Sequence, residues 1–362
     1  MAINRVELKD FLVFKGGFST DFCSGVNVLI GGNGTGKTTL MKVLYWGCEF
    51  SNKSVLTDNG KLNFGINQNS PFNAIFLLYS YFNQLNAENV SDYDYISNIK
   101  LYSDKILSSI YPVLDVSVSR GLGSIQIHDI GTNLPKNRAL AKWCKLKVKS
   151  VYIPATEMLS HSRGFLALNR ERPLPFDCTE MDIISKAELE PTRDITPNAN
   201  KIINIISELI GGIVKYDGKD FYIEHENGAS IPFSFEASGF RKLGLLWKLL
   251  RNGLLEKDAV LFWDEPENSL SPDLIPVLVD IVLELSRNGV QIFIATHSEI
   301  LASYFAVNRH SADHVLFTSL YKEDGRIESN ASDRFDLLTP NKLTEEPVKL
   351  YERKLDRGLG GA

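Results

Sequence analysis

Short apolar runs alternate with amphipathic segments along this chain. The mostly apolar runs predict buried strands; they lie at residues 26–30, 148–154, 260–263 and 290–295. The amphipathic segments have apolar residues at helical spacing and predict helices; they lie at residues 198–211, 238–250 and 271–287. Strands and helices that alternate in this way are typical of a parallel sheet covered by helices.

Two other stretches have the pattern of antiparallel strands. Residues 3–30 predict two or three strands, with a turn at Gly16-Gly17. Residues 212–235 predict a three-stranded meander, because hairpin dipeptides stand at Asp217-Gly218 and Asn227-Gly228. We therefore expect a small antiparallel β subdomain beside the parallel sheet.

The segment 66–145 is polar but rich in aromatic residues. Helical spacing near residues 71–86 and 100–110 predicts a mostly helical insertion. Disorder is a poorer interpretation, because so many aromatic side chains favour a core. Beyond residue 320 the chain is charged and weakly patterned, so residues 321–362 are interpreted as a C-terminal tail.

Composition narrows the class of protein. The chain has 362 residues, of which 44% are hydrophobic and 23% charged, as in ordinary globular proteins. The net charge of −5 argues against a surface that coats nucleic acid throughout, although a local basic patch remains compatible with it. The four cysteines are widely spaced, the N-terminus does not resemble a signal peptide, and no apolar run suits a membrane span. We expect a soluble cytoplasmic protein without membrane contact.

Residues 31–38 fit the pattern G-x-x-x-x-G-K-[ST] between an apolar strand and a helical run. In such a loop backbone N–H groups surround phosphate oxygens, the lysine reaches the β- and γ-phosphates, and the Ser/Thr hydroxyl binds Mg²⁺. The alternative, an ordinary glycine-rich turn, does not explain this strand–loop–helix context. The predicted nucleotide-binding residues are Gly31, Asn33, Gly34, Thr35, Gly36, Lys37, Thr38 and Thr39.

The apolar run at residues 260–263 ends in Asp264 and Glu265. A carboxylate at the end of such a strand lies beside the phosphate loop and can hold Mg²⁺, and the next one can polarise the attacking water. The alternative is an acidic cluster at the start of a helix. Together with the loop upstream, Asp264 is predicted as a metal ligand and Glu265 as a catalytic residue.

Two further segments carry candidate chemistry. The next apolar strand ends at His297, which can hydrogen-bond the γ-phosphate there, although a histidine at a strand end is more often a plain surface residue. A helix begins at Ser238-Gly239, where a hydroxyl and backbone amides can face a phosphate. The alternative for this turn is a helix N-cap and nothing more.

Taken in order, these motifs resemble the head of an ABC-class ATPase. The opening residues 4–11, followed by the loop at 25–37, are typical of the branch related to RecF, SMC and OLD proteins. The segment 153–159 is shared with ATP-binding proteins of bacterial anti-phage and toxin-like modules. The resemblance covers about half of the chain.

This resemblance implies an α/β fold: a P-loop NTPase of ABC type, with a mixed sheet and helices on both faces. It implies one discontinuous domain, whose segments are 1–65 with 146–165 (nucleotide-binding lobe), 66–145 (insertion), 166–236 (helical and β-meander region), 237–320 (signature, Walker B and His297 lobe) and 321–362 (tail).

Two departures from the family pattern stand out. The transporter-type signature Leu-Ser-Gly-Gly-Gln is replaced by residues 237–241, in which Ser238 and Gly239 match but a cation, Arg241, occupies the glutamine position. Ala155 stands where the Q-loop glutamine is expected. Glu157 is a candidate metal ligand in its place, against the default of a surface glutamate.

The resemblance also implies a mechanism. Two protomers sandwich two molecules of ATP with Mg²⁺, so that Lys37, Glu265 and His297 of one face Ser238 and Gly239 of the other. ATP binding then closes the dimer and hydrolysis releases it. On this reading the ATPase regulates a separate effector, such as a nuclease or toxin, in a defence or toxin-type system.

The sequence leaves two alternatives open: a RecF-like DNA-repair ATPase and, much less favoured, a transporter subunit. A basic run around Trp143 could contact nucleic-acid phosphates, although a solvated lysine-rich strand edge is the favoured interpretation. The run consists of Lys136, Arg138, Lys142, Lys145, Lys147 and Lys149, and a second basic cluster consists of Arg163, Arg170 and Arg172.

Overall fold

A computed structural model of the chain describes residues 3–53, 55–56, 62–63, 96–104, 112–119, 125–127, 135–172 and 176–359. Its centre is a six-stranded mixed sheet in the order β16-β15-β3-β14-β13-β9, in which only β16 is antiparallel to its neighbour. These strands are β3 (Val26–Gly31), β9 (Ser150–Ile153), β13 (Val260–Asp264), β14 (Gln291–Ala295), β15 (Val315–Glu323) and β16 (Arg326–Ser332). The four predicted buried strands are confirmed as the parallel neighbours β3, β14, β13 and β9, of which β9 forms the edge.

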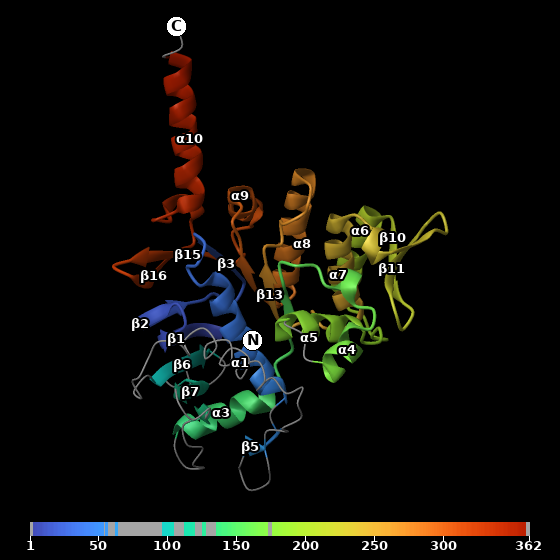
Figure 1. The fold of residues 1–362 in the computed structure, drawn as a ribbon, viewed down its shortest axis with the longest axis horizontal. Coiled ribbons are helices and arrows are strands. Elements are labelled where there is room, and N and C mark those ends of the chain that lie inside the picture. Colours follow the sequence, from blue (N-terminus) through green and yellow to red (C-terminus); the bar gives the residue numbers. More distant parts are fainter. Residues whose placement is uncertain are drawn as a thin grey trace.

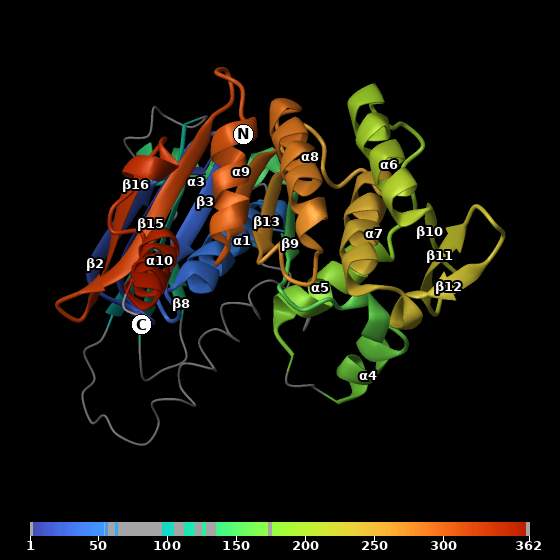
Figure 2. The same ribbon diagram turned by 90° about the horizontal axis from the view of Figure 1, so that it is seen from above.

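Helices cover both faces of this sheet, and β3 shows why. Val26, Val28 and Ile30 point into one core and Leu29 into the other, because side chains alternate along a strand. The first core is closed by α5 (Cys178–Ala187), α6 (Pro197–Ile210), α7 (Ser238–Arg251), α8 (Ile275–Arg287) and α9 (Glu299–Asn308), and the second by α1 (Lys37–Lys53) and α3 (Pro135–Leu146). Figure 2 shows these layers from above.

A second sheet packs against α1. It is antiparallel, in the order β2-β1-β6-β7-β8, and its strands are β1 (Ile3–Phe11), β2 (Phe14–Asp21), β6 (Ile96–Ser103), β7 (Leu114–Ser119) and β8 (Ile125–Ile127). Gly47 of α1 permits this close packing: a Cβ there would lie 2.0 Å from Cδ1 of Leu101 in β6. α1 therefore lies between two sheets (Figure 1).

The insertion differs from its prediction. Within residues 66–145 the described elements are β6, β7, β8 and most of α3. The predicted helix at 100–110 is therefore wrong for residues 100–103, which belong to strand β6. Strand β6 is instead recruited as the neighbour of β1, and this long-range pairing overrides the local helical spacing. The predicted helix near 71–86 lies outside the described residues; a short strand pair, β4 (Val55–Leu56) and β5 (Leu62–Asn63), precedes it.

The predicted meander is confirmed as a three-stranded sheet of β10 (Gly212–Tyr216), β11 (Phe221–His225) and β12 (Ser230–Pro232). It packs beside α6 and α7, and α4 (Phe165–Glu171) lies nearby in Figure 1. Phe233 anchors this region: it is fully buried and contacts Phe221.

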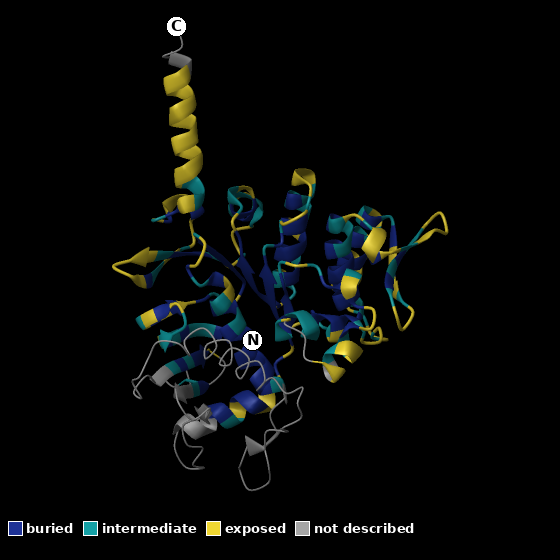
Figure 3. Ribbon diagram, in the orientation of Figure 1, coloured by how far each residue is buried: buried dark blue, intermediate teal, exposed yellow. Residues whose placement is uncertain are grey.

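The C-terminal segment is more ordered than its charged sequence indicates. Residues 315–332 form the hairpin of β15 and β16 at the edge of the central sheet, and α10 (Lys342–Leu359) stands away from the body (Figures 1 and 3). The description of 321–362 as a weakly patterned tail is thus wrong for both elements. An edge strand needs only one buried face, so β16 can carry polar residues. Within the described residues, no helix has the length and apolar character of a membrane span.

Candidate functional site

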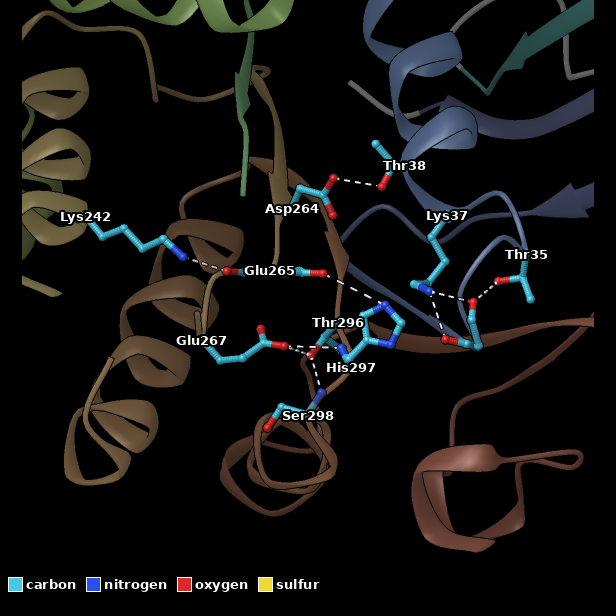
Figure 4. Close-up of polar contacts among 12 residues, drawn as sticks. Thr35, Lys37, Thr38, Lys242, Asp264, Glu265, Glu267, Thr296, His297 and Ser298 are labelled. Carbon is cyan, nitrogen blue, oxygen red and sulfur yellow. Dashed lines mark hydrogen bonds and ion pairs between the residues drawn. The ribbon is translucent and has the colours of Figure 1, made fainter. Parts of the chain in front are cut away.

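The phosphate loop connects the end of β3 to the start of α1. Its Lys37 ammonium donates hydrogen bonds to the carbonyl oxygens of Gly31 (2.8 Å) and Gly32 (3.2 Å). The Thr35 hydroxyl also donates to Gly32 O, at 2.8 Å. Figure 4 shows both side chains turned onto their own loop. The loop is therefore pre-shaped, with its lysine held at the centre.

Two positions of this loop have no room for a side chain and therefore require glycine. Gly36 has φ +89°, and a Cβ there would lie 2.7 Å from Cζ of Phe14 and 2.8 Å from Cγ2 of Val13. At Gly31 a Cβ would lie 2.2 Å from the carbonyl oxygen of Leu320. The loop is wedged between the β1–β2 turn and β15, so its N–H groups stay accessible only without side chains.

Lys37 lies in a buried environment. Loss of solvent lowers the pKa of its ammonium, and the nearby carboxylates of Asp264 and Glu265 act in the opposite direction. Binding of a phosphate would stabilise the charged form of Lys37, because the phosphate neutralises the positive charge that burial disfavours.

Thr38 and Asp264 meet as predicted. The Thr38 hydroxyl donates to Oδ2 of Asp264 at 2.8 Å, and the Tyr152 hydroxyl donates to the same oxygen at 3.2 Å. Burial raises the pKa of Asp264, and these two hydrogen bonds oppose the rise. Burial also raises the pKa of Tyr152 well above its ordinary range, so this phenol stays a donor.

These groups fit a Mg²⁺–nucleotide complex. A hydroxyl and a carboxylate within hydrogen-bonding distance are the hard oxygen ligands that Mg²⁺ takes beside phosphate. Thr38 and Asp264 would hold the ion, while Lys37 and the loop N–H groups would hold the phosphates. When bound, the ion would neutralise charge that develops on the transferred phosphoryl group.

Glu265 and His297 approach each other across the ends of β13 and β14. Asp264 is paired with Ala295 in the register of these parallel strands, which brings the two following segments together. Oε1 of Glu265 lies 3.9 Å from Nε2 of His297, and both side chains are about one-third exposed (Figure 4). This pair opens toward solvent on the side of Lys37, where an attacking water and a γ-phosphate would meet.

Glu267 holds the segment that carries His297. Its Oε1 accepts hydrogen bonds from the Thr296 hydroxyl (2.6 Å) and from the backbone N–H of His297 (3.2 Å). The backbone of His297 is thereby held by a carboxylate that follows the neighbouring strand. Sequence reasoning gave Glu267 no role, although its place in the acidic run was visible.

Ser238 and Gly239 begin α7, on the far side of β14 and β13 from the phosphate loop. Gly239 packs tightly on the chain segment after Glu265: a Cβ there would lie 3.3 Å from Ser269 O and 3.2 Å from Cδ2 of Leu270. The Ser238 hydroxyl donates to Ser269 O at 3.5 Å. The described contacts of this turn are thus with the Ser269 segment and not with the phosphate loop of the same chain.

Glu157 is engaged elsewhere. Its carboxylate accepts hydrogen bonds from the N–H groups of Leu159 and Ser160 and lies 3.4 Å from the guanidinium of Arg241. Arg241 is the cation at the signature glutamine position, so it pairs with the residue that was the candidate substitute for the Q-loop glutamine. A place for Glu157 in the metal shell would require these contacts to break.

Several residues of the basic run around Trp143 are not available to bind a nucleic acid. Trp143 is fully buried, with its indole N–H donated to Gly47 O. Lys147 and Lys149 donate to backbone carbonyls, and Lys149 also pairs with Glu256 at 3.0 Å. Lys142 and Lys145 are exposed on α3, while the side chains of Lys136, Arg138 and Arg170 lie outside the described set. Stacking of bases on Trp143 is therefore not supported.

Lys242 also escaped sequence analysis. It follows Ser238 by one helical turn, and its ammonium donates to the backbone oxygens of Glu265 (2.7 Å) and Asn268 (2.8 Å). The available signal was its i, i+4 spacing from Ser238, which places both residues on one face of the helix.

Two protein-family models match the sequence. Residues 1–152 match a family described as "AAA ATPase domain", and residues 156–303 match one described as "AAA domain, putative AbiEii toxin, Type IV TA system". The junction falls between β9 and the segment that carries Glu157. No curated protein matches the sequence.

One solved structure shows the same fold, and two others resemble the chain more weakly. An SMC head bound to the C-terminal winged-helix domain of ScpA superposes with a TM-score of 0.52 at 13% identity, covering 92% of this chain and 98% of that one. The SMC head of Thermotoga maritima gives 0.47 at 13% identity, covering 92% and 99%. The ADP form of an ATP-binding cassette from an ABC transporter gives 0.40 at 14% identity, covering 96% and 99%.

Proposed function

We propose that the chain is an ABC-class ATPase of the SMC- and RecF-like branch, and that two copies of it close around two ATP molecules to control a separate effector protein. The observation that carries this proposal is the position of the signature turn. Ser238 and Gly239 contact the Ser269 segment of their own chain, whereas Glu265 and His297 are about one-third exposed. A second copy can complete the site beside them.

The geometry of the sheet supports this arrangement. The phosphate loop and His297 follow β3 and β14, and Asp264 is the last residue of β13. The carboxyl ends of these parallel strands lie at one edge of the sheet. The signature turn lies beyond β13 from the loop, and each strand adds about 5 Å. A two-fold axis would bring the loop of one copy opposite the turn of the other, as in an isologous interface.

Mixing two inactive variants tests the composite site. Lys37→Ala removes the phosphate-binding lysine and Ser238→Arg blocks the signature turn, so each variant alone is expected to hydrolyse almost no ATP. In an equal mixture each heterodimer has one site with both parts intact. Turnover is therefore expected to recover to roughly a quarter of the wild-type rate, measured as phosphate release.

A mixture of Lys37→Ala with Glu265→Gln is the matched control. Both defects lie on the same half of the site, so every dimer keeps a defect in each site and no recovery is expected. An equal lack of recovery in both mixtures, with all variants folded, would contradict a composite site.

Two comparisons support a partner on another chain. The family that matches residues 156–303 is described as a putative AbiEii toxin of a type IV toxin–antitoxin system, which is a system of more than one component. The SMC head in the similar structure is bound to ScpA, which is a different protein.

The nucleotide state should decide whether the effector is held. We expect Glu265→Gln, trapped with ATP, and Lys37→Ala, which lacks nucleotide, to differ at least several-fold in the amount of one co-purified protein from the native host. Mass spectrometry of the two purifications, with wild type beside them, measures this difference. Identical partner profiles in all three purifications would argue against control by ATP.

A further inference from the structure

Lys242 is a buried lysine at one side of the site, next to the segment that carries Glu265. Its side chain is 3% exposed, and its ammonium donates to the carbonyl oxygens of Glu265 at 2.7 Å and Asn268 at 2.8 Å. Figure 4 shows it reaching from α7 toward the chain segment that carries Glu265. Its bonds end on backbone oxygens, so it fixes the path of this segment.

That segment has an unusual backbone. Glu265 has φ +47° and Ser269 has φ +65°, both in the left-handed region that costs non-glycine residues free energy. The N–H of Glu265 donates to Ala295 O at 2.9 Å, while its carbonyl accepts from Lys242. The peptide groups on either side of the Glu265 Cα are therefore held from opposite directions, which sets where its carboxylate points.

The other end of the contact is the signature turn. Lys242 lies one turn beyond Ser238 on α7, and Gly239 packs directly on Ser269 and Leu270. The start of α7 and residues 265–270 are thus joined by a charged contact and by close packing. A displacement of the signature turn would move Lys242 and, through it, Glu265.

Stability alone does not explain a lysine here. Burial lowers the pKa of Lys242 to about 8, although the carboxylates of Glu267, Glu265 and Asp264 act in the opposite direction. A buried charge is costly, and an apolar side chain of similar volume is often tolerated in its place. The lysine is better explained by its hydrogen bonds to the backbone oxygens of Glu265 and Asn268.

We propose that Lys242 is a positioning residue that ties Glu265 to the signature turn of the same chain, so that contact of this turn with a second copy sets the geometry of hydrolysis. This inference rests on the proposed closure of two copies. Lys242 would then connect two ATP sites: the partner's site, which the signature turn of this protomer completes, and the protomer's own site, which contains Glu265.

Lys242→Met tests the link, because methionine fills similar volume without the charge or donors. We expect kcat to fall roughly 10- to 100-fold, as for other displacements of a reacting group, while the Kd for ATP stays within about twofold, because no nucleotide contact is lost. In a Glu265→Gln background, Lys242→Met is expected to cause little further loss, since both changes act through one carboxylate.

Lys248→Met is the matched control. Lys248 is buried on the same helix, six residues or about 9 Å further along, so its loss tests the removal of a buried ammonium away from Glu265. Wild-type kcat is expected for it. If Lys242→Met does not fold, as judged by thermal unfolding, Lys242→Gln replaces it with the same expectation.

The outcomes separate this inference from the proposed dimer. Wild-type kcat in a folded Lys242 variant, equal loss in Lys248→Met, or full additivity with Glu265→Gln would overturn the role of Lys242. ATP-dependent dimer formation of Glu265→Gln is measured in the same series by light scattering. Its absence would refute the dimer and with it the coupling to a second copy.

Discussion

Replacement of Glu265 by glutamine is expected to slow ATP hydrolysis by roughly 10²- to 10³-fold while ATP still binds. Phosphoryl transfer depends mainly on positioning and on charge, and Glu265 is the carboxylate next to Asp264 that faces His297 at 3.9 Å. Glutamine keeps the shape and the backbone, so Lys242 can still hold the segment. Single-turnover phosphate release measures the rate, and light scattering with ATP and Mg²⁺ is expected to show an accumulated dimer.

Glu208→Gln provides the control for this change. Glu208 is an exposed residue of α6, away from the strand ends of the site, and its variant is expected to keep the wild-type rate. Wild-type turnover of Glu265→Gln would remove Glu265 from the role of polarising water, and would transfer that role to another group near His297.

Lys37→Ala is expected to abolish useful ATP binding, with a rise in Kd of about 100-fold or more. A charge-assisted hydrogen bond to phosphate contributes about 1.5–3 kcal/mol, and each 1.4 kcal/mol changes Kd tenfold. The loss is at the high end because Lys37 is buried, so that no solvent cation replaces it. Titration calorimetry with ATP and Mg²⁺ measures the affinity.

Lys42→Ala is the control on the same helix. Lys42 pairs with Asp177 at 2.9 Å and not with the phosphate loop, so its loss is expected to leave ATP affinity within about threefold. Unchanged affinity in Lys37→Ala, with the fold intact, would count against the phosphate loop as the nucleotide site.

The parallel centre of the sheet was predictable because its signal is local. Residues 260–263 are all apolar and residues 290–295 are apolar except for Gln291, and only a strand covered on both faces needs such a run. The insertion was not predictable in the same way: β6 pairs with β1, almost a hundred residues earlier, and nothing in the spacing of its side chains names that partner. Strand β16 was not predictable either, because it lies at the edge of the sheet and its polar residues give no apolar pattern.

By itself, the sequence determined the chemistry of the site: a phosphate loop with Lys37 and Thr38, then Asp264 with Glu265, then His297. These residues can be recognised in the sequence because each follows or ends a mostly apolar run that itself predicts a buried strand. Only the tertiary structure decided how these groups are held. Lys242 bonds the backbone of Glu265, Glu267 holds the segment of His297, and Arg241 pairs with Glu157. Such contacts join elements distant in sequence, and their partners are chosen by packing rather than by any local pattern.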